Sequence, residues 1–265
     1  MPGADMSDPI KLGLWGPSSA GKTAYLAQLY LHIPRLEEVW SVLPTDDSNR
    51  FMDSLRPEID RSRFPKATAI TQAITKVAYK FSNRKTGQEA ELVVEDRAGK
   101  EFQDLSGENR KRLNEVHGLM VLFDAEADGQ TRRQMIEQTL SRLSVDAARG
   151  GRRDERPVAV CLSKADRLIR TPADLTLAVE APRQFVLDRI DNDLLHWVDR
   201  FCSNYELFPI SSVGVRVRHG VVDPVVFRDE RLDLRVCGEG KPINLIAPIA
   251  WLFERIAVPG ARQEP

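Results

Sequence analysis

Short apolar segments recur along this chain and are separated by longer segments of mixed polarity. A short apolar run predicts a strand covered on both faces, whereas apolar residues three and four positions apart predict one face of a helix. The predicted strands are residues 10–15, 73–81, 89–95, 118–123, 158–162 and 208–210. The predicted helices are residues 25–33, 45–55, 101–116, 131–148, 175–207 with a break at Pro182, and 245–256.

Turn residues add two hairpins to this pattern. Residues 82–87 are typical of a tight turn, so the predicted strands on either side of them form an antiparallel pair. Residues 215–236 alternate in places and carry turn signals at His219-Gly220 and Asp223-Pro224, which predicts an inserted hairpin. Elsewhere strands alternate with helices. This order predicts an α/β domain with a mostly parallel sheet and helices on both of its faces.

Composition excludes several classes of protein. The 265 residues include 39 acidic and 38 basic side chains, a net charge of −1 that argues against a nucleic-acid partner. The three cysteines are widely spaced and odd in number, so we expect neither a zinc site nor disulfides, as in a reducing cytoplasm. The longest apolar run, residues 243–253, is too short to span a bilayer, and residues 1–9 do not read as a signal peptide. We therefore expect a cytoplasmic protein without direct membrane insertion.

The segment from Gly16 to Thr23 carries the first functional signal. It reads Gly-x-x-x-x-Gly-Lys-Thr between a predicted strand and a predicted helix, which is the context of a phosphate-binding loop. Gly16 and Gly21 let backbone N–H groups converge on a polyphosphate at the positive end of the helix. Lys22 adds a charge for the outer phosphates, and the Thr23 hydroxyl is a ligand for Mg²⁺. The predicted contact residues are Gly16, Ser18, Ser19, Ala20, Gly21, Lys22, Thr23 and Ala24.

A second signal follows the predicted strand that ends at residue 95. Asp96 offers a carboxylate that can hold Mg²⁺ opposite Thr23. Gly99, three residues later, offers its backbone N–H to a γ-phosphate. These two residues predict that the bound nucleotide is a triphosphate in at least one of its states.

Two further segments decide which base fits. Asp166 closes the segment after the strand at residues 158–162, and a carboxylate there can accept both N1–H and N2–H₂ of guanine. Adenine has neither donor on that edge, so an unmatched carboxylate beside it would be costly. Ser211 and Ser212 follow the last core strand, where a backbone N–H can meet the guanine O6. The sequence therefore predicts a guanine nucleotide as partner.

These four segments, in this order, resemble the guanine-nucleotide motifs of Ras-like GTPases, within the translation-factor-related class of P-loop GTPases. The resemblance covers residues 10–256, and residues 246–253 also resemble the end of bacterial double-GTPase domains. It implies a P-loop NTPase three-layer sandwich with a mostly parallel six-stranded sheet in the order 2-3-1-4-5-6, strand two being antiparallel. The remaining ranges would be a disordered tail at residues 1–9, insertions at about 172–207 and 213–240, and a tail at 257–265.

The resemblance also implies GTP or GDP with Mg²⁺ as ligands, and it assigns roles to further residues. Lys164 would pack under the base and ribose, and Ser211 would brace the base-binding loop. A threonine ahead of the second strand would bind Mg²⁺ and the γ-phosphate. That placement favours Thr68, then Thr71, over Thr75.

Two positions depart from the family pattern. Ser163 replaces the usual asparagine of the base-binding motif, which loosens the contact with purine N7. Lys100 replaces the usual water-positioning glutamine; it cannot orient water as an amide does, but it can neutralise charge on the γ-phosphate. Gln103 is close enough in sequence to act instead, so Lys22, Lys100 and Gln103 are the predicted catalytic residues. We expect the intrinsic hydrolysis to be slow. Faster hydrolysis would require a partner that supplies an arginine or glutamine.

Three functional interpretations follow. The first is a GTP-binding switch with slow Mg²⁺-dependent hydrolysis, read by a protein effector or activating partner at residues 35–71. The second is an interaction module that binds guanine nucleotide without hydrolysing it, which Lys100 and Ser163 favour. The third, an ATP-dependent kinase or ATPase, is disfavoured because Asp166 would then have no base to read.

Overall fold

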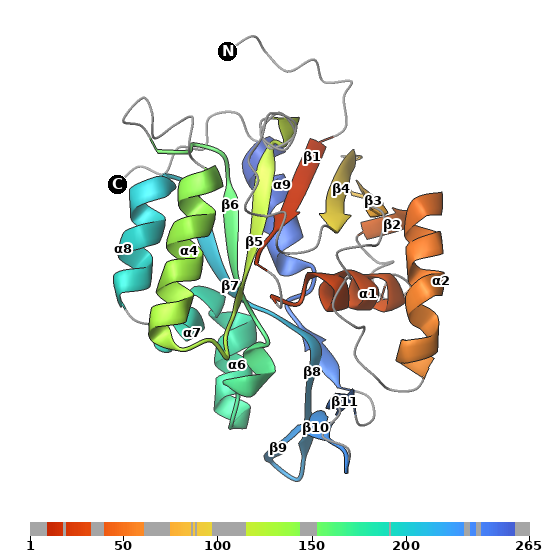
Figure 1. Ribbon diagram of the computed structural model, residues 1–265, viewed down its shortest axis with the longest axis vertical. Coiled ribbons are helices and arrows are strands. Elements are labelled where there is room, and N and C mark those ends of the chain that lie inside the picture. Colours follow the sequence, from red (N-terminus) through yellow and green to blue (C-terminus); the bar gives the residue numbers. More distant parts are fainter. Residues whose placement is uncertain are drawn as a thin grey trace.

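A seven-stranded sheet forms the centre of the molecule (Figure 1). The computed structural model describes residues 10–17, 20–32, 40–60, 75–85, 87, 89–96, 115–143, 153–190, 192–230, 234–236 and 240–257. The sheet order is β2-β3-β4-β1-β5-β6-β7. These strands are β1 (Ile10–Trp15), β2 (Trp40–Pro44), β3 (Thr75–Asn83), β4 (Glu89–Asp96), β5 (Gly118–Asp124), β6 (Val158–Ser163) and β7 (Tyr205–Pro209). Neighbours from β4 to β7 pair in parallel, and β2 and β3 pair antiparallel.

The predicted α/β architecture is confirmed, with one strand more than expected. Without β2, the observed order β3-β4-β1-β5-β6-β7 is the predicted order 2-3-1-4-5-6, with the second strand antiparallel. The extra strand β2 lies at the edge of the sheet and, among the described strands, pairs with β3 alone. Val42 is buried while the adjacent Leu43 is exposed. So short a half-buried segment leaves little periodic signal in the sequence.

Helices cover both faces of the sheet and make the predicted three layers. One face packs against α1 (Lys22–His32), α2 (Asp46–Asp60) and α9 (Ala247–Ala257). The other packs against α4 (Gly129–Leu143), α6 (Pro172–Glu180), α7 (Pro182–Leu187) and α8 (Asn192–Phe201). Side chains of β5 alternate between the two cores, because Met120 points to the first and Leu119 and Val121 to the second. Among the described residues, no helix is long and apolar enough to cross a membrane.

The predicted helix over residues 175–207 is wrong at its C-terminal end. Tyr205 to Leu207 belong to β7, which pairs in parallel with β6. Leu207 and Phe208 are buried in opposite cores, which is the alternation of a strand, but aromatic residues upstream mask it with a helical period. The helical region also begins earlier, at α6, because Thr171 caps it: the Thr171 hydroxyl accepts the Asp174 N–H at 3.1 Å.

The predicted inserted hairpin is confirmed and is larger than expected. The inserted strands are β8 (Ser211–Arg218), β9 (Val221–Pro224), β10 (Val226–Arg228), β11 (Leu234–Val236) and β12 (Lys241–Ile243). They form two small sheets, β12-β8-β9 and β10-β11, which extend beyond the edge of the central sheet at which α1 begins (Figure 1). Because β8 starts at Ser211, the insertion grows directly from a predicted base-binding residue.

Other expectations fall on parts of the chain that the structure does not describe. The tail at residues 1–9 lies outside the described residues, as does nearly all of the predicted helix over residues 101–116. These expectations therefore stay predictions. The predicted closing helix is confirmed as α9, which starts after a bend at Asn244, a residue with a φ of 51°.

Replacing Tyr25 by phenylalanine tests the packing of α1 against the segment before α9. The Tyr25 hydroxyl donates to the Leu245 carbonyl oxygen at 2.6 Å, and both groups are buried. Its loss leaves that carbonyl unpaired, so we expect Tyr25→Phe to lower the free energy of unfolding by about 1–3 kcal/mol in urea titrations. The control is Tyr30→Phe, whose part-buried bond to Asn49 is 3.3 Å long and should cost less. Equal stability of Tyr25→Phe and wild type would contradict this account.

Candidate functional site

The parallel strands deliver the predicted motifs to one edge of the sheet. The strands β1, β4, β5, β6 and β7 end there at Trp15, Asp96, Asp124, Ser163 and Pro209. Asp124 lies opposite Ser163 in the β5–β6 register. Gly13 lies opposite Val93 in the β1–β4 register, so β1 and β4 run side by side towards the same edge. The loops that follow these strands therefore share one region of the surface.

The phosphate-binding loop connects β1 to α1 as predicted. Gly16 and Gly21 have backbone φ values of 154° and 82°, which residues with a Cβ rarely adopt. A Cβ on Gly16 would also lie 2.7 Å from the carbonyl oxygen of Leu122 in β5, whereas a Cβ on Gly21 would meet nothing within 4 Å. Gly16 is thus required by conformation and by close packing, and Gly21 by conformation alone.

Lys22 folds back over this loop. Its ammonium donates to the carbonyl oxygens of Gly16 at 2.7 Å and Pro17 at 3.1 Å. Lys22 is the first residue of α1 and Thr23 the second. The first N–H groups of a helix have no partner within the helix and carry its positive dipole end. The ammonium and the start of the helix together form a site suited to an anion.

The base-binding motif begins with a turn after β6. The Ser163 hydroxyl donates to the Phe123 carbonyl oxygen at 2.9 Å and is buried, so it joins β6 to β5. Lys164 follows with a φ of 59°, in the left-handed region. This turn leads into the short 3-10 helix η3 (Ala165–Arg167), which carries Asp166.

Asp166 is fixed by the start of the insertion. The Ser211 hydroxyl donates to the Asp166 carboxylate at 2.5 Å and accepts the Gly214 N–H at 2.9 Å. The Ala165 N–H donates to the Ile210 carbonyl oxygen at 3.0 Å. Burial raises the pKa of Asp166, although the Ser211 hydrogen bond and the charge of Arg167 oppose that shift. Ser212 is the next residue on β8 and is half-buried.

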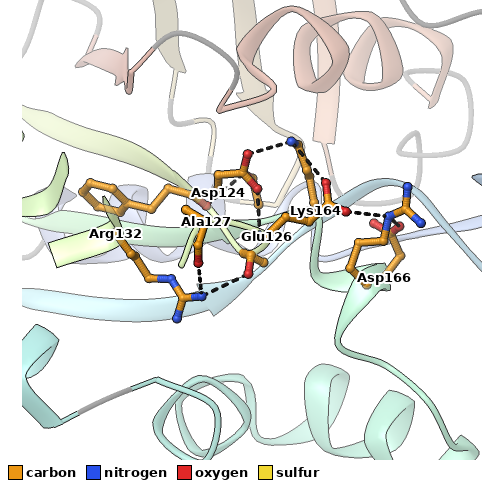
Figure 2. Close-up of polar contacts among 10 residues, drawn as sticks. Asp124, Glu126, Ala127, Arg132, Lys164 and Asp166 are labelled. Atoms are coloured by element: carbon orange, nitrogen blue, oxygen red, sulfur yellow. Dashed lines mark hydrogen bonds and ion pairs between the residues drawn. The ribbon is translucent and has the colours of Figure 1, made fainter. Parts of the chain in front are cut away.

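A group of charged residues surrounds Lys164, and sequence reasoning did not find it (Figure 2). The Lys164 ammonium lies 2.7 Å from the Asp124 carboxylate and 3.5 Å from the Glu126 carboxylate. Arg167 lies 3.3 Å from Glu126 and 3.9 Å from Asp166. Asp124 directly follows an apolar strand, as Asp96 does, so its position at a strand end was an available signal.

Several predicted site residues lie outside the described residues. They are Ser18, Ser19, Thr68, Thr71, Gly99, Lys100 and Gln103. Asp96 is the last residue of β4, opposite Thr75 at the start of β3. The assignments of these residues to catalysis, Mg²⁺ and the γ-phosphate therefore stay predictions.

Three comparisons with known proteins add to this geometry. No curated protein matches the chain. Among solved structures, the chain is similar to the GTPase-like domain of S. cerevisiae Ski7, bound to GDP and inorganic phosphate, with a TM-score of 0.47 and 15% sequence identity. That match covers 77% of this chain and 43% of the Ski7 chain, so this chain spans less than half of its length.

The family comparison covers most of the chain. The family model described as "Double-GTPase 2" matches residues 10–216. The matched part runs from β1 to the middle of β8, so it includes the phosphate loop and the segments that hold Asp166 and Ser211. On that match, this chain belongs to the Double-GTPase 2 family.

Proposed function

We propose that this protein binds GTP and GDP with Mg²⁺, hydrolyses GTP slowly, and works as a switch whose nucleotide state is read by a protein partner. The observation that carries the proposal is the part-buried Asp166 carboxylate, held by Ser211 at the same sheet edge as the phosphate loop. Membership in a GTPase family supports guanine as the base. One ligand with a guanine at one end and phosphates at the other would engage both parts.

The chemistry of Asp166 favours guanine over adenine. An ionised carboxylate has two acceptor oxygens and no donor, which matches the N1–H and N2–H₂ of guanine. The Ser211 hydroxyl uses one lone pair of one Asp166 carboxylate oxygen and helps to orient the carboxylate. The other lone pairs remain for the base. Adenine would give the part-buried carboxylate no donor from the base, and the oxygen turned towards the base would stay unpaired, at a cost of about 1–3 kcal/mol.

The residues at the phosphate end fit a polyphosphate with its metal ion. In this proposal, the backbone from Gly16 to Ala24 and the Lys22 ammonium bind the phosphates. Thr23, Asp96 and Thr68 would hold Mg²⁺, which supplies positive charge beside the phosphate oxygens when it is bound. The support for this fit is the loop itself, since Gly16 and Gly21 hold its backbone in conformations that suit glycine, and the Lys22 ammonium lies over the loop beside the start of α1.

The switch would involve segments on both sides of the γ-phosphate. Thr68 and residues 96–103 would be held together in the GTP state and released after hydrolysis. Residues 35–71 would form the partner surface, and their described part includes β2 with its exposed Leu43. In the sequence, Lys100 replaces the usual water-positioning glutamine and Gln103 is a nearby substitute, so we propose that a partner supplies an arginine or glutamine for fast hydrolysis.

A second function is a guanine-nucleotide-binding module that does not hydrolyse GTP. Lys100 favours it, because an ammonium cannot orient an attacking water as an amide does. Single-turnover incubation with GTP and Mg²⁺ separates the two functions: slow release of phosphate supports the switch, and intact GTP after many hours supports the module.

Removing the Lys22 ammonium should weaken nucleotide binding. Lys22→Ala deletes a charged donor beside the phosphates, so we expect GDP affinity to fall about 10- to 100-fold in titrations with a fluorescent GDP analogue. Lys80→Ala, on the exposed side of β3, removes the same charge elsewhere and serves as the control. Unchanged affinity of Lys22→Ala would count against the phosphate site.

Changing Asp166 to asparagine should change which base is bound. The asparagine oxygen still accepts the Ser211 hydroxyl, but its NH₂ group opposes the guanine N2–H₂ and matches the O2 of xanthine. We expect the preference for GDP over XDP to reverse, with a change of at least about tenfold in the affinity ratio. Competition titrations measure the ratio. An unaltered ratio would place the base elsewhere.

Guanine binding should weaken as the pH falls, and the decline should begin at a pH above the ordinary pKa of an aspartate. Because the pKa of Asp166 is raised in the free protein, the carboxylate takes up a proton as pH falls and loses its acceptor role. Because the folded pKa lies above the unfolded one, protonation of this group favours the folded free protein, so the group itself does not promote unfolding as the pH falls. Titrations from pH 7 down towards the ordinary pKa of an aspartate should show the decline in wild type. The decline should be missing in Asp166→Asn, and a decline of equal size there would contradict the assignment.

A further inference from the structure

Lys164 makes ion pairs with two carboxylates. It sits between the end of β6 and η3, with its ammonium 2.7 Å from Asp124 and 3.5 Å from Glu126 (Figure 2). Asp124 is the last residue of β5, and Glu126 lies in the turn between β5 and α4. The ammonium is therefore held at the end of β5, and only the apolar stem of Lys164 remains for contact with a neighbouring ring.

Asp124 is itself held rigidly. Its other carboxylate oxygen accepts the Glu126 N–H at 2.9 Å. The next residue, Ala125, donates its N–H to the Ser163 carbonyl oxygen at 3.0 Å. Arg132 of α4 donates to the carbonyl oxygens of Ala125 at 3.0 Å and Ala127 at 2.8 Å, which fixes the turn from the other side. Asp124 thus offers Lys164 a fixed anchor.

The two carboxylates are not equivalent partners. The Asp124 side chain is 11% exposed and close to the ammonium, whereas the Glu126 side chain is 47% exposed and further away. Exposed ion pairs contribute little because water screens them, and less exposed pairs contribute more. The Asp124–Lys164 contact therefore determines where the ammonium lies.

We propose that Asp124 is a positioning residue of the guanine site, which fixes Lys164 so that its stem lies along one face of the base. This inference rests on the proposed function, because it requires a guanine nucleotide beside Asp166. A free lysine side chain samples many rotamers, and binding would have to restrict them. Anchoring by Asp124 restricts them before the nucleotide arrives, so the bound nucleotide is retained longer.

The experiment measures the dissociation rate of a fluorescent GDP analogue from four full-length proteins. They are wild type, Asp124→Asn, Lys164→Met and the double variant. Asparagine keeps the oxygen that accepts the Glu126 N–H but removes the charge, and methionine keeps an apolar stem without the ammonium. We expect each single variant to release GDP about 3- to 10-fold faster.

The double variant separates positioning from a structural role. If Asp124 acts through Lys164, the double variant releases GDP no faster than Lys164→Met alone. Glu126→Gln, the matched control for the more exposed carboxylate, should change the rate less than about twofold. The GDP-to-IDP affinity ratio should stay at its wild-type value in Asp124→Asn, because Asp166 reads the exocyclic amino group.

The outcomes also separate this inference from the proposed function. An unchanged rate in Asp124→Asn, or an equal acceleration by Asp124→Asn in the Lys164→Met background, would overturn the positioning role alone. Wild-type protein that binds no GDP would overturn the proposed function and this inference with it.

Discussion

Parallel pairing of the central strands is the constraint on which the candidate site depends. The hydrogen bonds of β1 with β4 and β5, and of β6 with β5 and β7, make five strands end at one edge. Residues far apart in the sequence meet there: Lys164 and Asp124 are 40 positions apart, and Ser211 and Asp166 are 45 apart. Apolar cores on both faces of the sheet stabilise this pairing. A shift of register in one strand would separate the groups that we assign to one ligand.

The base end of the site is linked directly to the inserted strands. Ser211 bonds Asp166, belongs to β8, and lies opposite Ile243 of β12. Gly214 has a φ of 70°, and a Cβ there would lie 1.7 Å from the Lys241 carbonyl oxygen, so the backbones of β8 and β12 pack in direct contact. Asn244 then donates to the carbonyl oxygens of Ala178 and Pro209. The Asp166 carboxylate, which would bind the base, is thus held by the first residue of the inserted strand β8.

Much of the fold could be predicted from sequence because buried parallel strands appear as short apolar runs followed by polar residues. That signal located β1, β4, β5 and β6 and the residues at their ends. It failed where two periods overlap, as at Tyr205 to Leu207, and at the edge of the sheet, where β2 pairs with β3 on one side. The Asp124–Lys164 contact could not be predicted, because one sequence does not record which separated charges meet. The family resemblance implied only that Ser211 braces the base-binding loop, and the structure shows that its hydroxyl bonds the Asp166 carboxylate.

A crystal structure of the protein grown with GDP and Mg²⁺ tests the central claim most directly, because it locates both ends of the ligand at once. The account predicts the phosphates inside the loop from Gly16 to Thr23 and the Asp166 carboxylate within hydrogen-bond distance of guanine N1 and N2. A nucleotide bound elsewhere, or a base turned away from Asp166 while the phosphates occupy the loop, would contradict it.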